Sequence, residues 1–288
     1  IDVNAVNRDD ETALICAVFS GHADVVKHLL EHVNIDVIKC DDSGRTPLML
    51  AVERGHADVV KHLLEKDEGG ELKHKSISVN DRINYDNRYA EDTPLTLAIK
   101  EGTQGVIECL LDVPGIDVNR PNRSGSTPLM CAAEFGRADV VSHLLQTDGD
   151  RQLIHKTEIN RQNDKEETAL MLAMKTMNVD AVERLLAVPD ILVDLCNKDG
   201  DTALMVALKQ DKSDEEEIVR CVTAFLDSIE RSNPRIQCNI NQLNKKSNNA
   251  LIIAIQKRSR PVVERLLAFP WINVNQYEGT RIPLVIAY

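Results

Sequence analysis

Histidine and cysteine are the side chains in this sequence that could act as bases, nucleophiles or metal ligands. His28, His62 and His143 occupy the same place in the pattern Val-Val-x-His-Leu-Leu. A duplicated packing residue is the simpler interpretation of this pattern, and a catalytic base is the alternative. Cys16 and Cys131 also share one position, which favours small core side chains. A zinc site needs four convergent ligands, and the copies lie too far apart to supply them, so we expect no metal. We also expect no catalytic group and no cofactor.

Bulk composition excludes several classes of function. The seven cysteines are an odd number without a Cys-x-x-Cys pair, which predicts free thiols in a reducing, cytoplasmic compartment. The chain has 46 acidic and 34 basic residues, and its net charge of −12 repels nucleic acid. No run of about 18 apolar residues occurs, so we expect no membrane insertion. No phosphate loop or dinucleotide-binding glycine pattern occurs, and we expect no small-molecule substrate.

A three-residue signature, Thr followed by Pro or Ala and then Leu, recurs along the chain. Steps of 34 residues alternate with longer steps, which is typical of stacked repeats with insertions. Six clear copies and two degenerate ones are present: Thr12-Ala13-Leu14, Thr46-Pro47-Leu48, Thr93-Pro94-Leu95, Thr127-Pro128-Leu129, Thr168-Ala169-Leu170, Thr202-Ala203-Leu204, Asn249-Ala250-Leu251 and Ile282-Pro283-Leu284.

Each copy predicts two short helices and a turn. Thr46 is a helix cap, and the proline after it suits a first helical turn because its missing N–H needs no partner there. This helix ends near Gly55, and a second helix carries the apolar pairs Val59-Val60 and Leu63-Leu64. The polar stretch 41–44 predicts a tight turn.

These residues resemble the ankyrin repeat, whose pattern is roughly D-x-x-G-x-T-P-L-H-x-A-A-x-x-G-H. Residues 41–56 and 122–136 match it best, and the resemblance covers almost the whole chain. It implies an all-α fold, a single solenoid over residues 1–288 of paired antiparallel helices with β-hairpin connections. About seven full repeats are expected, beginning near residues 7, 41, 88, 122, 163, 197 and 244, with a partial repeat from 277.

The sequence departs from the family pattern at two positions. The fifth to seventh copies lack the glycine that ends the first helix and carry Met177, Asp211 and Arg258 instead. In the family, the histidine of T-P-L-H ties neighbouring loops together, so its loss implies looser loops. That histidine is replaced in every copy, by Ile15, Met49, Thr96, Met130, Met171, Met205, Ile252 and Val285.

A pair of repeats is the unit that duplicated, because signatures two copies apart are separated by 81, 75 and 81 residues. Extra residues follow the second, fourth and sixth copies, around 67–79, around 147–157, and split between 211–217 and 229–238. They are either tolerated loops or extensions of a binding surface along one edge. Both ends fall inside a unit and lack a polar outer face, so we expect a fragment of a longer protein.

In ankyrin arrays a partner protein usually lies in the concave groove formed by the hairpin tips and the first helices. The resemblance therefore implies an aromatic first half and a basic second half, which suit a partner with an apolar anchor and an acidic stretch. Lysines scattered over a solvated face are the alternative. The partner-binding residues expected on this basis are Phe19, Glu53, Arg54, Tyr89, Asp92, Glu134, Phe135, Lys175, Lys209, Lys245 and Lys246.

One modification site follows from the resemblance. Leu111, five residues and then Asp117-Val118-Asn119 have the spacing of ankyrin hairpins that are substrates of asparaginyl hydroxylation. A turn asparagine that bonds its own backbone is the alternative interpretation of Asn119.

The sequence thus predicts a non-enzymatic scaffold for protein–protein interaction. We expect an adaptor or targeting region of a larger protein, such as an intracellular-pathogen effector acting in a host cytosol. The alternative is a substrate-recognition region attached to a catalytic domain outside this sequence. A third possibility is part of a channel-type or membrane-skeleton scaffold.

Overall fold

The computed structural model describes residues 2–81, 92–147, 155–211, 214–232 and 236–274. The partial repeat expected from residue 277 lies outside these ranges. Contacts between residues group the chain into two compact units, residues 1–128 and 129–288. Each unit is described by itself, and the expectation of one continuous array over both stays a prediction.

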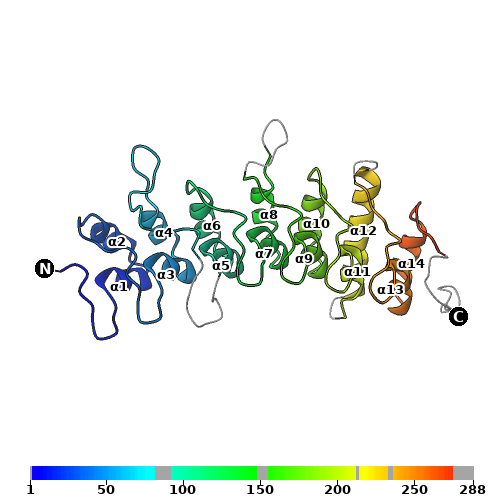
Figure 1. Cartoon of the computed structure of the whole chain (residues 1–288), viewed down its shortest axis with the longest axis horizontal. Coiled ribbons are helices and arrows are strands. Elements are labelled where there is room, and N and C mark those ends of the chain that lie inside the picture. Colours follow the sequence, from blue (N-terminus) through cyan, green and yellow to red (C-terminus); the bar gives the residue numbers. More distant parts are fainter. Residues whose placement is uncertain (1, 82–91, 148–154, 212–213, 233–235, 275–288) are drawn as a thin grey trace. The chain divides into compact units, whose positions relative to one another are not determined.

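In the first unit, helices pair into hairpins that stack on one another (Figure 1). The first helix of each pair contacts the first helix of the next, and the second helices likewise contact one another. We call these the inner and outer rows. The inner row holds α1 (Ala13–Phe19), α3 (Pro47–Arg54) and α5 (Pro94–Glu101), and the outer row holds α2 (Ala23–Leu30), α4 (Ala57–Leu63) and α6 (Gln104–Leu111).

The second unit has the same two rows. Helix α7 (Pro128–Glu134) begins at the last residue of the first unit. Helix α12 has 18 residues where the other outer helices have 7 or 8, so the split insertion of the sixth copy lengthens a helix. The inner row continues with α9 (Ala169–Lys175), α11 (Ala203–Leu208) and α13 (Ala250–Gln256), and the outer row holds α8 (Ala138–Leu144), α10 (Val179–Leu186), α12 (Glu215–Ser232) and α14 (Arg260–Leu267).

The recurrent threonine begins the inner helices as predicted. The hydroxyls of Thr12, Thr46, Thr93 and Thr168 each accept a hydrogen bond from the amide three residues on, and Asn249 does the same through its carboxamide. Leucines and alanines that follow them are buried between successive helices. Short helices of this kind are stabilised mainly by that packing, since helices of about 12 residues or fewer are marginal alone.

The glycine position that follows the inner helix requires left-handed backbone. Gly55 has φ +71°, and its amide closes the end of α3. Met177 and Arg258, which replace this glycine, adopt the same conformation with φ +55° and +58°. A side chain at such a φ is strained by about 1–2 kcal/mol. The repeat geometry therefore persists where the sequence lost the residue that suits it.

The turns before the inner helices share one closed geometry, which we call the tip. In the tip at residues 41–45, the amide of Asp41 donates to the carbonyl of Arg45, 3.0 Å away. The Asp41 carboxylate accepts hydrogen bonds from the amides of Ser43 and Arg45, so one side chain organises the whole turn. The same bonds close the tips at 7–11, 122–126, 163–167, 197–201 and 244–248.

The connections are hairpin-shaped, but they form no continuous β-ladder in the described ranges. Isolated bridges join Val6 to Thr12 and Lys66 to Leu72. The second bridge flanks a tip at residues 67–71 in the first insertion, closed by the amide of Asp67 and the carbonyl of Glu71. The chain therefore reverses direction at these connections as predicted. Hydrogen bonds from side chains to backbone amides close the turns, in place of most of the pairing between strands.

Candidate functional site

The phenylalanines divide sharply between core and surface. Phe225 and Phe269 are each 1% exposed, whereas Phe19 and Phe135 are 40% and 45% exposed. Phe19 is the last residue of α1, and Phe135 directly follows α7. Both rings therefore stand at the same end of inner helices, in different units. Tyr89, the third aromatic residue expected here, lies outside the described residues.

Phe19 contacts the next repeat while it remains exposed. The guanidinium carbon of Arg54 lies 3.9 Å from the centre of the Phe19 ring, a cation–π geometry. The carbonyl of Phe19 also lies 3.4 Å from Nε2 of His56. These contacts bring the ring and the guanidinium together on the surface at the ends of α1 and α3.

Asp92 is not on the solvent face, and its expected exposure is wrong. Its side chain is 3% exposed, and its carboxylate accepts hydrogen bonds from Lys100 at 2.8 Å and from Asn122 at 3.0 Å. Thr96 donates a further hydrogen bond at 3.2 Å. Burial of an ionised carboxylate requires such partners. Asp92 therefore joins helix α5 to the tip at residues 122–126 inside the first unit.

The Asp92–Lys100 arrangement recurs, and we call it the tip-to-helix pair. One member directly precedes the helix cap, and the other lies eight residues later on the inner helix. Lys175 pairs with Glu167 at 3.2 Å, and Lys209 pairs with Asp201 at 2.6 Å. Glu53, which is 17% exposed, lies 3.5 Å from Arg45 with the charges exchanged. The two groove lysines are consequently half-buried and neutralised, so they contribute little to a basic surface.

The tips of the second unit are joined through their main chains. The amide of Lys198 donates to the carbonyl of Lys165 at 3.2 Å, and the amide of Lys245 donates to the carbonyl of Asp199 at 3.1 Å. The expectation of looser loops without the family histidine is therefore wrong for these tips. Lys245 and Lys246 are exposed, as is Glu134 on α7.

Four asparagines, which sequence analysis overlooked, hold the loops that follow the outer helices. Asn160 donates to the carbonyl of Asp190 at 2.8 Å and accepts from the amide of Leu192 at 2.9 Å. Asn4, Asn80 and Asn241 make the same two bonds to the residues around 34–36, 115–117 and 271–273. These asparagines recur at intervals close to the length of a pair of repeats, and this recurrence could have identified them in the sequence.

Asn119 occupies the position in its own repeat that Asn160 and Asn241 occupy in theirs, eight residues before the helix cap. It is half-buried, and its amide donates to the Asp117 carboxylate at 3.0 Å. A structural role for the side chain accords with that position. Hydroxylation of Asn119 stays a prediction.

The titratable groups do not form a catalytic arrangement in the described part of the chain. Burial is the main cause that raises the pKa of six thiols, to about 12 for Cys221 and Cys238, whereas a nucleophilic cysteine needs a lowered pKa. His143 stacks on His155 with ring centres 5.4 Å apart, and burial lowers the pKa of His155. No group of three or more His, Cys, Asp or Glu side chains there could hold a metal ion.

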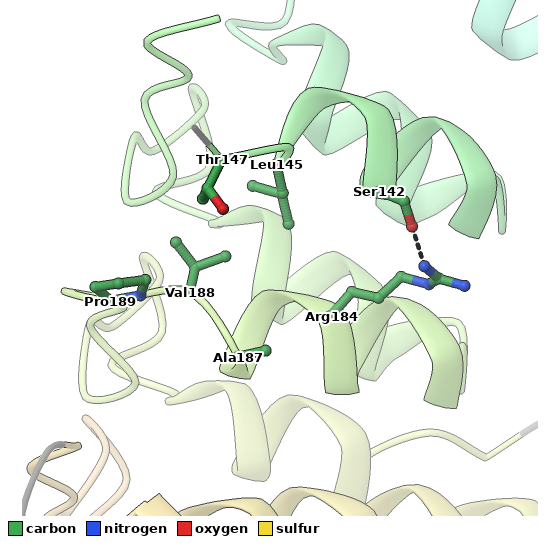
Figure 2. Close-up of a pocket in the computed structure, with 7 residues that line it drawn as sticks. All are labelled: Ser142, Leu145, Thr147, Arg184, Ala187, Val188 and Pro189. Carbon is green, nitrogen blue, oxygen red and sulfur yellow. Dashed lines mark hydrogen bonds between the residues drawn. The ribbon is translucent and has the colours of Figure 1, made fainter. Parts of the chain in front are cut away.

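A cleft of about 410 Å³ lies beside α8 and α10, which pack against one another in the outer row of the second unit (Figure 2). Figure 2 shows Arg184 reaching towards α8, where its guanidinium donates a hydrogen bond to Ser142. The remaining lining residues are Leu145, Thr147, Ala187, Val188 and Pro189. With one ionisable group, this set of seven has no base–nucleophile pair and therefore no catalytic chemistry.

Comparison with known proteins identifies the repeat. The family model "Ankyrin repeats (3 copies)" matches residues 1–76, 71–152 and 150–224, which is more than half of the chain. The chain belongs to the ankyrin repeat family. The ankyrin repeat is a non-catalytic interaction fold, and proteins use it to bind other proteins.

Two similar proteins agree with this assignment. The ankyrin repeat domain of human ASB11 is 25% identical, with a TM-score of 0.57 over 80% of this chain and 88% of that domain. Neurogenic locus notch homolog protein 1 of Xenopus laevis is 30% identical over 170 residues, which is 59% of this chain. The match spans 6% of the length of that notch homolog. Within the described ranges, no ankyrin helix is both long enough and apolar enough to cross a bilayer.

Proposed function

We propose that this ankyrin region holds a partner protein on its inner face and serves as an adaptor or targeting region. The observation that carries the proposal is the exposure of Phe19 and Phe135, in a chain with only four phenylalanines. An exposed ring adds little to folding, because its apolar surface stays in water. Aromatic side chains are common anchors of protein interfaces. Each ring stands at the end of an inner helix and favours an interface on the inner row of its own unit.

The structure removes three charged residues from the set of expected contact residues. Lys175 and Lys209 are held in tip-to-helix pairs, and Asp92 is buried. The proposed contact residues are therefore Phe19 and Arg54 in the first unit, and Glu134, Phe135, Lys245 and Lys246 in the second. A protein partner remains the proposal in preference to nucleic acid, because the net charge is −12.

The cellular setting is proposed on chemical grounds. None of the seven cysteines forms a disulfide, which supports a reducing, cytoplasmic compartment. An effector acting in a host cytosol and an adaptor of the same cell both fit that setting. The sequence of the flanking regions would separate these from a substrate-recognition region of an enzyme.

Cross-linking mass spectrometry on partners captured with this chain tests the proposal. A photoreactive amino acid is introduced at Phe19 or at Phe135, and in a control chain at Val25, which is 44% exposed on the outer helix α2. We expect one partner to cross-link from both inner positions and not from Val25. Cross-links that form only from Val25 would place the interface on the outer row and contradict the proposal.

A further inference from the structure

A contiguous strip of side chains crosses the inner face of the first unit. It consists of Asp9, Glu11, Cys16, Phe19 and Arg54. The Cys16 thiol donates to the Glu11 carboxylate at 3.5 Å. Cys16 is exposed, so the expectation of a core side chain is wrong for it, and it lies three residues before Phe19 on the same face of α1. Arg54 lies over the Phe19 ring at the other end.

One end of this strip carries uncompensated negative charge. Asp9 and Asp10 are exposed on the first tip, and no cation of the described residues pairs with either carboxylate. After burial, the Glu11 and Asp9 carboxylates are further causes that raise the pKa of the Cys16 thiol. Their negative potential therefore reaches the middle of the strip. The Glu11 carboxylate contacts Cys16, which lies one helical turn before the exposed Phe19 ring.

The acidity of the whole chain is concentrated in this unit. Residues 1–128 carry 23 acidic and 14 basic side chains, whereas residues 129–288 carry 23 and 20. A unit with such an excess attracts cations over several ångströms and speeds their association. In the basic second half expected from the sequence, Lys175 and Lys209 are paired with acids, and Lys245 and Lys246 stay exposed.

We propose that this strip binds an extended segment of the partner that presents a lysine or arginine to Asp9 and Glu11 and an apolar side chain to Phe19. The inference rests on the proposed function and specifies the chemistry of the partner. Arg54 is placed to donate to a carbonyl of the same segment. The step from Cys16 to Phe19 is about 4.5 Å along the helix, and an extended residue spans about 3.3 Å. Because the Glu11 carboxylate contacts Cys16, the basic and apolar residues of the segment are about one or two positions apart.

Selection from a random 12-residue peptide library on the immobilised whole chain tests this chemistry. We expect the enriched peptides to carry lysine or arginine one or two positions from a leucine, isoleucine, phenylalanine or methionine. Their affinity should fall as salt rises from 50 to 300 mM, because exposed charges are screened. Enrichment of neutral or acidic peptides, or of no peptide above the bare support, overturns the proposal.

Two charge reversals separate local recognition from net charge. Asp9→Lys changes the first tip, and Glu68→Lys makes the same change in charge on the outer tip at residues 67–71, which has the same closure. We expect Asp9→Lys to weaken the selected peptides at least tenfold and Glu68→Lys to change their affinity less than twofold. An equal loss of peptide affinity in both variants would show an effect of net charge alone and would contradict the proposal.

A third variant distinguishes failure of this inference from failure of the proposed function. Phe19→Ala should weaken every selected peptide. If the selected peptides depend on Phe19 but lack basic residues and tolerate Asp9→Lys, the inner-face function stands and the inference about a cationic segment is wrong. If they depend on neither residue, both are wrong. Unchanged circular dichroism and melting temperature are required of each variant.

Discussion

The carboxylate of Asp92 lies 2.8 Å from the ammonium nitrogen of Lys100, which is eight residues further along the chain, on helix α5. Equivalent pairs join Glu167 to Lys175 and Asp201 to Lys209. In each pair, the acid that directly precedes the helix cap binds a lysine on the inner helix that follows. These charges therefore stabilise the repeat and are not available to a partner.

Replacement of Asp92 by alanine should lower the free energy of unfolding by about 2 kcal/mol. The change leaves the buried amide of Asn122 and the hydroxyl of Thr96 without this acceptor, and Lys100 without its counter-ion. Urea denaturation measures the effect. Lys246→Ala, at an exposed tip, is the control and should stay within about 0.5 kcal/mol of wild type. An unchanged urea midpoint for Asp92→Ala would contradict the assignment of a structural role.

The left-handed residue after α13 offers a stabilising change. Arg258→Gly should raise the free energy of unfolding by about 0.5–1 kcal/mol, because glycine adopts φ +58° without strain. Arg260→Gly is the matched control in the first turn of α14, where glycine should destabilise by about 1 kcal/mol. The two urea midpoints should move in opposite directions, and a shift of both in the same direction would argue against strain at Arg258.

Much of the repeat was predictable from the sequence, because local residues determine it. Thr46 caps its helix and Gly55 ends it through bonds within about nine residues, so pattern and propensity suffice. Burial of Asp92 was not predictable in the same way, since it depends on Asn122 in the next repeat. The recurrence of an acid eight residues before a lysine in three copies was a usable signal for these pairs, whereas the sequence analysis assigns Asp92, Lys175 and Lys209 to the partner-binding surface.

Alkylation of Cys16 should depend on Glu11. Burial raises the pKa of the Cys16 thiol, and the hydrogen bond to Glu11 raises it further because the carboxylate favours the protonated thiol. Glu11→Gln removes that negative charge, so the pKa should fall and iodoacetamide should react faster at pH 8. Peptide mass spectrometry measures the rate at Cys16 and, as control, at the exposed Cys40. Equal acceleration at both cysteines would indicate local unfolding rather than loss of this contact.

The melting temperature should be independent of chelator and of reductant. The seven cysteines are free, and no described cluster of side chains suits a metal ion. Differential scanning fluorimetry with EDTA and with dithiothreitol should give values within about 1 °C of the untreated protein. A fall of several degrees with either reagent would show a stabilising metal site or disulfide and contradict the account of the cysteines.

The affinity of the cross-linked partner for Phe19→Ala and Phe135→Ala tests the central claim most directly. Loss of each exposed ring should weaken binding at least tenfold, which corresponds to about 1.4 kcal/mol, while the free energy of unfolding falls by no more than about 1 kcal/mol, the value of the Phe19–Arg54 contact. Val25→Ala, at an outer-row residue with a similar exposed fraction, should bind within twofold of wild type. Full affinity together with a lowered melting temperature for the phenylalanine variants would show that the rings serve packing, and would contradict an interface on the inner face.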